Sequence, residues 1–152
     1  MPTYRYPRPA MTADVALFRE GEGMEVLLIR RARPPFEGKW ALPGGFVDEM
    51  EPPEQAACRE LAEETGVELP KAAMHPVAAF GEPGRDPRGW TVSVAFWAEA
   101  PVEAAPHPAD DAAETRWWPV GALPPLAFDH DRIVAEALRA RCREQVAGEA
   151  CR

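Results

Sequence analysis

Residues 45–67 read GFVDEMEPPEQAACRELAEETGV, and this stretch predicts more about the protein than any other part of the chain. Residues 54–65 are rich in Ala, Glu, Leu and Arg, which are good helix formers. The prolines at 52–53 suit a first helical turn, where no backbone N–H is needed, and Gly66 suits a left-handed cap. The stretch therefore predicts a helix over residues 54–65.

Acidic side chains share one face of this helix. At about 100° per residue, Glu60, Glu63 and Glu64 lie together, whereas Ala57 and Leu61 point toward a core. Carboxylates this close repel one another and raise one another's pKa unless a cation compensates them. Mg²⁺ prefers such oxygen ligands, so the face predicts a divalent cation site. A solvated acidic helix face is the alternative.

A glycine pair precedes the helix. Gly44 and Gly45 permit a close backbone approach that side chains would block, and we expect them in a loop that runs toward the helix N-terminus. Such loops commonly bind phosphate. Together, the loop and the helix predict a metal-bound phosphate or pyrophosphate.

Residues 45–67 resemble the Nudix box, whose pattern is G-x5-E-x7-R-E-U-x-E-E-x-G-U, with U a bulky aliphatic residue. All nine fixed positions match, and they are Gly45, Glu51, Arg59, Glu60, Leu61, Glu63, Glu64, Gly66 and Val67. The resemblance implies an α/β Nudix fold, an α/β/α sandwich around a mixed β-sheet that carries the Nudix loop and helix. It also implies hydrolysis of a nucleoside diphosphate linked to another moiety, with Mg²⁺ or Mn²⁺ as cofactor.

The resemblance assigns roles to the residues of the box. It implies that Glu60, Glu63 and Glu64 ligate the metal together with the main-chain carbonyl of Gly44. Arg59 would orient the glutamates, and one carboxylate, in or outside the box, would serve as general base. Three positions would have a structural role, namely Gly45, Glu51 and Gly66. Of these, Glu51 would brace the loop.

An acidic residue outside the box completes the expected site. Glu114 lies where many Nudix enzymes supply an extra carboxylate, and we favour it over Asp110 and Asp111 as a fourth ligand or base. A solvated loop acid is the alternative. The expected catalytic residues are then Arg59, Glu60, Glu64 and Glu114.

Three further stretches resemble bacterial ADP-ribose pyrophosphatases, and equally the Nudix-related regulators of NAD metabolism whose effector is ADP-ribose. They are residues 3–18, 84–93 and 126–130. The resemblance implies hydrolysis of ADP-ribose to AMP and ribose 5-phosphate.

Four residues are candidates for contact with this substrate. Arg85 and Arg88 lie in the second stretch, and a guanidinium fork suits phosphate or ribose, although solvated arginines are the alternative. Arg31 ends a predicted strand and is expected to reach a phosphate, unless it is a surface charge. Asp129 is expected to contact substrate, but a helix N-cap would explain it as well.

Two other functions fit the same residues. A house-cleaning nucleoside triphosphate pyrophosphatase would release inorganic pyrophosphate, and a non-catalytic ADP-ribose sensor would bind without turnover. The related regulators carry an added DNA-binding domain and tend to lose box glutamates. Here the box is intact and 22 residues follow His130, so we favour the enzyme.

In the rest of the chain, predicted strands and a predicted helix follow one another as in a mixed α/β domain. Residues 1–10 are expected to form an extended arm, residues 101–113 an irregular connection and residues 129–146 a final helix, all within one domain over 1–152. The predicted strands are 11–18, 25–29, 40–42, 75–80, 90–98 and 115–118.

Composition excludes several classes of protein. The chain has 152 residues, of which 46% are hydrophobic, so it is not disordered as a whole, and no apolar run could span a membrane. Its net charge is −8, which disfavours nucleic acid as a partner. The resemblance implies a small-molecule nucleotide as substrate. The cysteines at 58, 142 and 151 form no CxxC pair, and with no secretory signal they predict a reducing cytoplasm. Similar Nudix enzymes are often dimers, which makes a homodimer possible.

Overall fold

A computed structural model of the protein describes the backbone of residues 3–150 and the side chains of residues 3–148. Residues 1 and 2 of the expected arm, and Cys151, lie outside the described part. The elements in chain order are β1 (Ala10–Glu20), β2 (Met24–Arg31), β3 (Trp40–Ala41), β4 (Gly44–Phe46), α1 (Pro53–Thr65), the 3₁₀ helix η1 (Lys71–Ala73), β5 (His75–Phe80), β6 (Thr91–Glu99), β7 (Ala112–Pro119) and α2 (His130–Ala150).

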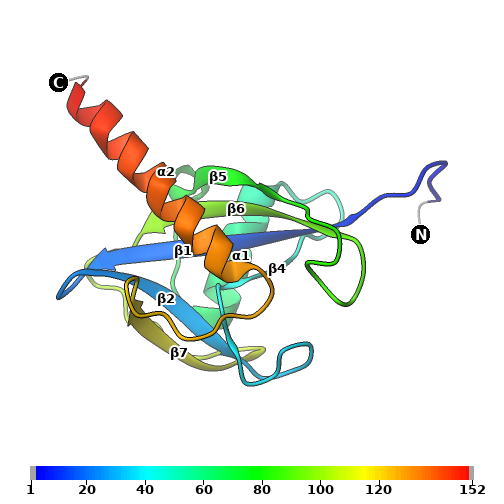
Figure 1. The fold of residues 1–152 in the computed structure, drawn as a ribbon, viewed down its shortest axis with the longest axis horizontal. Coiled ribbons are helices and arrows are strands. Elements are labelled where there is room, and N and C mark those ends of the chain that lie inside the picture. Colours follow the sequence, from blue (N-terminus) through cyan, green and yellow to red (C-terminus); the bar gives the residue numbers. More distant parts are fainter. Residues whose placement is uncertain (1–2, 151–152) are drawn as a thin grey trace.

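The strands form one mixed sheet between the two helices. The order is β3-β2-β1-β6-β5, with β4 paired to β1 and β7 paired to β2. Strands β1 and β6 are parallel, whereas the other pairs are antiparallel. Figure 1 shows α2 across one face of the sheet and α1 behind the other. The expected α/β/α sandwich is confirmed.

Strand β1 is buried on both faces because each helix covers one of them. Val15 packs in the same cluster as Leu61 of α1, and Phe18 packs in the same cluster as Ile133 of α2. Successive strand residues point to opposite faces, so even-numbered residues of β1 lie on the α2 side. Asp14 therefore falls in a row of core-facing positions.

Strands β1 and β2 diverge away from their hairpin. They pair only where residues 18–20 meet residues 24–26. Beyond that point β3 pairs with β2 and β4 pairs with β1, so residues 40–46 cross the space between the two diverging strands. The candidate site lies at this split in the sheet.

Most expected elements are present, with four differences. Residues 44–46 form a strand instead of a loop, for a reason given below, and η1 is a single turn too short to leave a periodic pattern. Strand β7 begins inside the stretch expected to be irregular, because β2 supplies it with a pairing partner from Ala112 onward. Helix α2 continues past residue 146 through Gly148, since one glycine costs a helix only about 1 kcal/mol.

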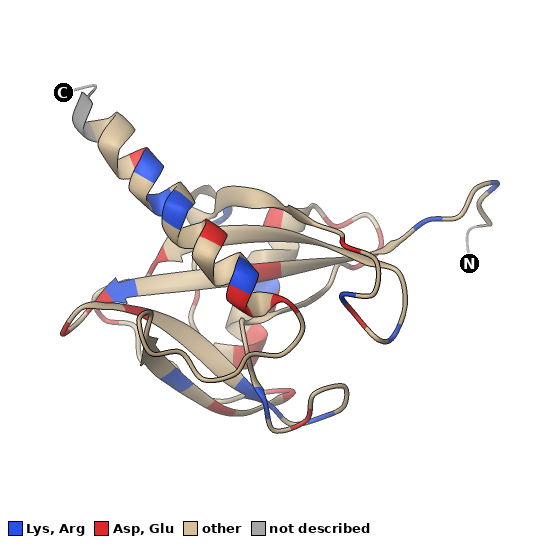
Figure 2. Ribbon diagram, viewed as in Figure 1, with Lys and Arg blue, Asp and Glu red and all other residues tan. Residues whose placement is uncertain are grey.

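Charge is unevenly distributed over these elements. Figure 2 shows acidic segments along α1 and basic residues on the loop between β5 and β6. Residues 41–70 alone hold eight acidic side chains and one basic side chain. Within residues 3–150, no helix is long and apolar enough to cross a membrane.

Candidate active site

Helix α1 ends where the sequence predicts, at Gly66. This residue has a φ of 76°, and its N–H donates to the carbonyl of Ala62. The left-handed conformation favours glycine. In addition, a Cβ at this position would lie 2.8 Å from Nε2 of His107, so the space also requires glycine.

Arg59 connects the helix to the loop before it. Its Nε donates to Glu51 at 2.8 Å, and its Nη2 donates to Glu51 at 2.9 Å and to the carbonyl of Phe46 at 3.0 Å. Its Nη1 donates to Glu60 at 2.8 Å and to Glu63 at 3.1 Å. Hydrogen bonding to Arg59 lowers the pKa of Glu51. Arg59 thus holds two of the three glutamates and the loop at once.

Gly44 and Gly45 belong to β4, and the expectation of a loop was wrong. A Cβ on Gly44 would clash with Oδ1 of Asp14 and lie 2.9 Å from its Cα, and a Cβ on Gly45 would lie 2.6 Å from the Glu60 carboxylate. Neighbouring strand residues point to opposite faces. One carboxylate therefore occupies the space beside each glycine, Asp14 on the α2 side and Glu60 on the α1 side.

The pairing of β4 turns the Gly44 peptide groups away from β1. Gly44 lies opposite Asp14, next to the position where Val15 N–H donates to the carbonyl of Pro43 at 2.9 Å. Hydrogen-bonded and non-hydrogen-bonded pairs alternate in an antiparallel ladder, so Gly44 occupies a non-hydrogen-bonded position. Its N–H donates instead to Oε1 of Glu64, at 2.7 Å. Its carbonyl points out on the same side.

Glu64 lies in an environment that disfavours its charge. The residue is only 6% exposed, and burial, followed by the charges of Glu60 and Asp14, raises its pKa to about 8, although the Gly44 N–H opposes the shift. Burial also raises the pKa of Glu60, with contributions from Glu63 and Asp110. The cluster has more negative charge than its surroundings compensate.

A divalent cation fits this donor set. Within the described residues, no three acidic, His or Cys side chains converge into a ready metal site, because Arg59 holds Glu60 and Glu63. However, Gly44, Glu60 and Glu64 line one cavity, and their carbonyl and carboxylate oxygens are hard donors. Mg²⁺ commonly uses one or two carboxylates and completes its shell with water and substrate phosphate. The raised pKa of Glu64 indicates that positive charge near this carboxylate does not offset its burial and the neighbouring negative charges.

A cavity of about 240 Å³ opens on the α1 side of β4. Its lining consists of Ile29, Arg31, Arg33, Pro34, Gly44, Glu60, Glu64, Arg88, Asp110 and Asp111. The structure thus brings two of the three expected glutamates, Glu60 and Glu64, together with Asp110 and Asp111, which the sequence analysis ranked below Glu114. Asp110 has a φ of 55°, within the left-handed region that Asp tolerates better than most residues.

Glu114 is not one of the described residues that line this cavity. It lies opposite Arg30 in the β2–β7 ladder and accepts a hydrogen bond from Arg30 Nε at 3.2 Å. The ladder shifts register between Arg30 and Arg31, and Arg31 faces the cavity. The preference for Glu114 therefore has no support in the geometry, since its side chain is engaged elsewhere.

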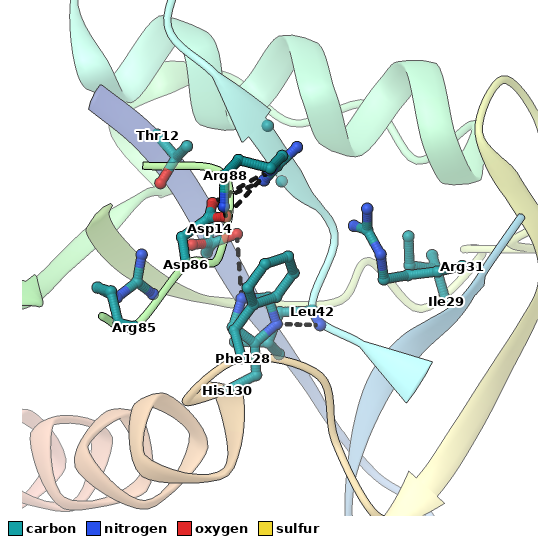
Figure 3. A pocket seen from close by; sticks show the side chains of 12 residues that line it. Thr12, Asp14, Ile29, Arg31, Leu42, Arg85, Asp86, Arg88, Phe128 and His130 are labelled. Atoms are coloured by element: carbon teal, nitrogen blue, oxygen red, sulfur yellow. Dashed lines mark hydrogen bonds and ion pairs between the residues drawn. The ribbon is translucent and has the colours of Figure 1, made fainter. Parts of the chain in front are cut away.

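A second, smaller cavity of about 40 Å³ lies on the α2 side (Figure 3). The residues that line this cavity alone are Thr12, Asp14, Leu42, Gly45, Arg85, Asp86, Phe128 and His130. It shares Ile29, Arg31, Gly44 and Arg88 with the first cavity. The two cavities therefore adjoin at the split in the sheet.

Three of the four expected substrate contacts line these cavities, Arg31 and Arg88 in both of them and Arg85 in the second. Within residues 3–148, the only hydrogen bond of the Arg31 side chain is from Nε to the carbonyl of Pro35, at 2.7 Å. Arg88 is oriented by Asp86, to which its Nη2 donates at 2.8 Å, and its guanidinium lies over the ring of Phe46, 4.8 Å from the centroid. Burial and the charge of Arg88 lower the pKa of Arg31. Both arginines present charge to the cleft.

Two of the expected contacts, Arg85 and Asp129, bind each other. Arg85 donates to both carboxylate oxygens of Asp129, at 2.6 and 3.0 Å, and its side chain is only 4% exposed. This pair ties the β5–β6 loop to the residue before α2. The pairing gives Arg85 and Asp129 a structural role, and Arg85 also lines the second cavity, so its contact with substrate stays a prediction.

The family follows from comparison with known proteins. The model of the NUDIX domain matches residues 8–137, which is most of the chain. The chain belongs to the Nudix family. The resemblance seen in residues 45–67 is confirmed, and so is the Nudix fold.

Three relatives of this Nudix chain are informative. The chain is 37% identical to the ADP-ribose pyrophosphatase of Methanocaldococcus jannaschii, over 88% of this chain and 76% of that protein. It is 39% identical to the ADPR responsive transcriptional repressor NtrR of Acinetobacter baylyi, over 87% of this chain but only 54% of that protein. The NUDIX domain of Shewanella oneidensis NrtR, solved with ADP ribose, is 35% identical and superimposes with a TM-score of 0.79, covering 93% of this chain and 90% of that domain.

Proposed function

We propose that this Nudix protein hydrolyses the diphosphate of ADP-ribose to AMP and ribose 5-phosphate in the cytoplasm, with Mg²⁺, which Mn²⁺ could replace. The observation that carries the proposal is the cleft at the split in the sheet. It joins the carboxylates of Glu60 and Glu64 to two arginines, Arg31 and Arg88. The ADP-ribose pyrophosphatase of M. jannaschii and the ADP ribose complex of the Shewanella domain support the choice of substrate.

The box residues would hold the cation. Glu60, Glu63, Glu64 and the carbonyl of Gly44 supply the oxygen donors, and Arg59 keeps Glu60 and Glu63 oriented. When bound, the cation would neutralise diphosphate charge and lower the pKa of the attacking water. Before it binds, Glu64 holds a proton near neutral pH, because burial raises its pKa to about 8.

The arginines would orient the substrate. Arg31 keeps its terminal nitrogens in the cleft, and Arg88 is already oriented by Asp86, so both are arranged to receive phosphate oxygens with little loss of side-chain entropy. As the extra carboxylate we propose Asp110 in place of Glu114, since Asp110 lines the cavity and its charge reaches Glu60. Asp110 is then a candidate general base.

One alternative has a specific observation in its favour. The identity to the ADPR responsive repressor of A. baylyi would fit an ADP-ribose sensor. All nine fixed residues of the Nudix box are present, which favours the enzyme.

Product analysis by chromatography tests the proposal. The protein is incubated with Mg²⁺ and, in parallel, ADP-ribose, NADH, diadenosine polyphosphates, nucleotide sugars and nucleoside triphosphates. We expect AMP and ribose 5-phosphate to form fastest from ADP-ribose, and Glu64→Gln to abolish this. Preferential pyrophosphate release from a triphosphate would replace the proposal with the house-cleaning function. Binding of ADP-ribose without turnover would replace it with the sensor.

A further inference from the structure

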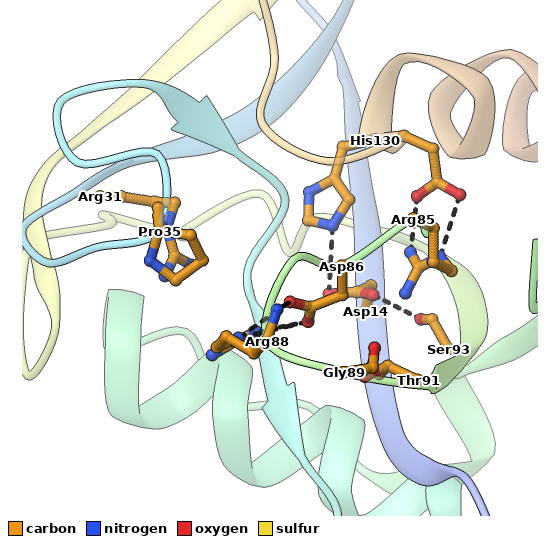
Figure 4. A network of polar contacts seen from close by, with 11 residues as sticks. Asp14, Arg31, Pro35, Arg85, Asp86, Arg88, Gly89, Thr91, Ser93 and His130 are labelled. Carbon is orange, nitrogen blue, oxygen red and sulfur yellow. Dashed lines mark hydrogen bonds and ion pairs between the residues drawn. The ribbon is translucent and has the colours of Figure 1, made fainter. Parts of the chain in front are cut away.

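A buried carboxylate outside the box lies directly behind the candidate metal site. Asp14 is 5% exposed and lies on the α2 face of β1, among core-facing positions. Its Oδ2 accepts a hydrogen bond from the Ser93 hydroxyl, and its Oδ1 lies 3.7 Å from Nε2 of His130 (Figure 4). A charged group in such a place is costly to bury, so its position calls for a role.

His130 has a defined proton arrangement. Its Nδ1 accepts a hydrogen bond from the backbone N–H of Leu42 at 3.0 Å, so Nδ1 carries no proton. The ring is 4% exposed, and burial lowers the pKa of His130, which keeps the ring neutral. The proton of the neutral ring is therefore on Nε2, on the side of Asp14. The Leu42 N–H fixes this tautomer, and the Asp14 carboxylate, 3.7 Å from Nε2, lies on the side to which the ring proton points.

The segment held by His130 contains the expected main-chain metal ligand. Residues 42–44 are attached at three points, namely Leu42 N–H to His130, the carbonyl of Pro43 to Val15 N–H, and Gly44 N–H to Glu64. The last two points both lie on the Pro43–Gly44 peptide group, and the first holds the Ala41–Leu42 peptide group at the start of the segment. Without the first, the orientation of the Gly44 carbonyl would depend on fewer contacts.

We propose that His130, oriented by Asp14, is a positioning residue for the metal site, because it holds the Leu42 N–H and so sets the direction of the Gly44 carbonyl. The inference rests on the proposed function, since it requires a cation at Gly44, Glu60 and Glu64. His130 does not line the cavity that holds Glu60 and Glu64. It acts through three residues of backbone, in the way that outer-shell partners orient metal ligands.

Two substitutions of His130 separate positioning from simple packing. The Asn amide oxygen in His130→Asn can occupy the place of Nδ1 and accept from Leu42, whereas the longer side chain in His130→Gln reaches the place of Nε2 and leaves Leu42 N–H without its acceptor. The measurements on the full chain are Mn²⁺ affinity by paramagnetic resonance, hydrogen exchange of the Leu42 amide, and the thermal midpoint. If His130→Gln does not fold, Asp14→Asn, which keeps the ring, takes its place.

We expect His130→Gln to weaken Mn²⁺ binding by about 10–100-fold and to speed exchange of the Leu42 amide, and we expect His130→Asn to stay within about threefold of the wild type. The inference requires Mn²⁺ affinity to follow Leu42 protection across the variants. Wild-type Mn²⁺ affinity in a folded variant whose Leu42 amide has lost protection would overturn it, as would lost affinity with full protection.

A control keeps this test independent of the proposed function. Glu64→Gln should lose Mn²⁺ binding while the Leu42 amide stays protected. If the wild type binds no Mn²⁺, or if Glu64→Gln binds it equally well, the proposed function fails. Suppose instead that the wild type binds Mn²⁺ and Glu64→Gln does not. If a His130 variant then loses protection of the Leu42 amide without a change in Mn²⁺ affinity, only the positioning role fails.

Discussion

The two glycines of β4 should respond to alanine in opposite ways. A Cβ on Gly44 would clash with the backbone carbonyl of Ala13 as well as with the Asp14 side chain, and backbone cannot rotate away. The nearest atoms to a Cβ on Gly45 are those of the Glu60 carboxylate, at 2.6–2.7 Å, and that flexible end can move. Gly44→Ala is therefore a stability variant, and Gly45→Ala is a site variant.

The magnitudes follow from these contacts. For Gly44→Ala, forcing β1 and β4 apart costs about 2–3 kcal/mol, as overpacking of a filled space does, and lowers the thermal midpoint by roughly 4–12 °C for a chain of this size. For Gly45→Ala, displaced Glu60 loses its hydrogen bond to Arg59, which costs about 1 kcal/mol. A misplacement of about 1 Å in a catalytic group lowers the rate by roughly 100-fold, which is what we expect for ADP-ribose hydrolysis by Gly45→Ala.

Scanning calorimetry and initial rates of AMP release measure the two effects. The double variant Gly44→Ala/Asp14→Ala is the internal control. It removes the side-chain clash and keeps the backbone clash, so it should remain destabilised. A Gly44→Ala protein that melts within 2 °C of the wild type, or a Gly45→Ala protein with full activity, would refute the assignment of the two carboxylates to opposite faces of β4.

Three further predictions concern other parts of the site. Arg85→Ala should destabilise the fold by about 3 kcal/mol, because it leaves Asp129 partly buried and unpaired. A double-mutant cycle with Asp129→Ala, measured by urea unfolding, should show coupling between the two residues, and additive effects would contradict the structural role. Asp110→Asn should lower the rate of ADP-ribose hydrolysis by about 100-fold and Glu114→Gln by less than threefold, and the reverse order would restore Glu114 as the extra carboxylate. The folded-state pKa of Glu64 lies above its unfolded value, so this group stabilises the metal-free protein fully below about pH 4.5, and that stability is lost as pH rises toward 8. Unfolding in EDTA should show a loss of about 2 kcal/mol between pH 6 and 8 that Glu64→Gln lacks, and an equal loss in the variant would exclude Glu64 as its source.

Local patterns in the sequence were sufficient for the helices, most strands and the glutamates of the box. Helix α1 ends at Gly66 because propensity and the left-handed cap act within a few residues. The shared face of Glu60, Glu63 and Glu64 follows from helical geometry alone. Periodicity likewise revealed β1 and β6, although it could not show that both faces of β1 would be covered.

Contacts between distant residues decided the rest. Gly44 and Gly45 form a strand because they pair with β1, and the positions need glycine because Asp14, thirty residues before Gly44, and Glu60, fifteen residues after Gly45, fill the space on the two faces. Arg85 and Arg88 are three residues apart in one loop, but only Arg88 faces the first cavity, since Asp129 binds Arg85 from another element.

The same distinction separates Asp110 from Glu114. Nothing in their local sequence ranks Asp110 higher, but the register shift between β2 and β7 places Asp110 in the cavity and Glu114 against Arg30. The link from Asp14 through His130 to Leu42 also joins three separate parts of the chain. Residue type and spacing specify which chemistry a chain can perform, whereas the partner that each charged side chain finds depends on strand register and packing, which only the folded chain contains.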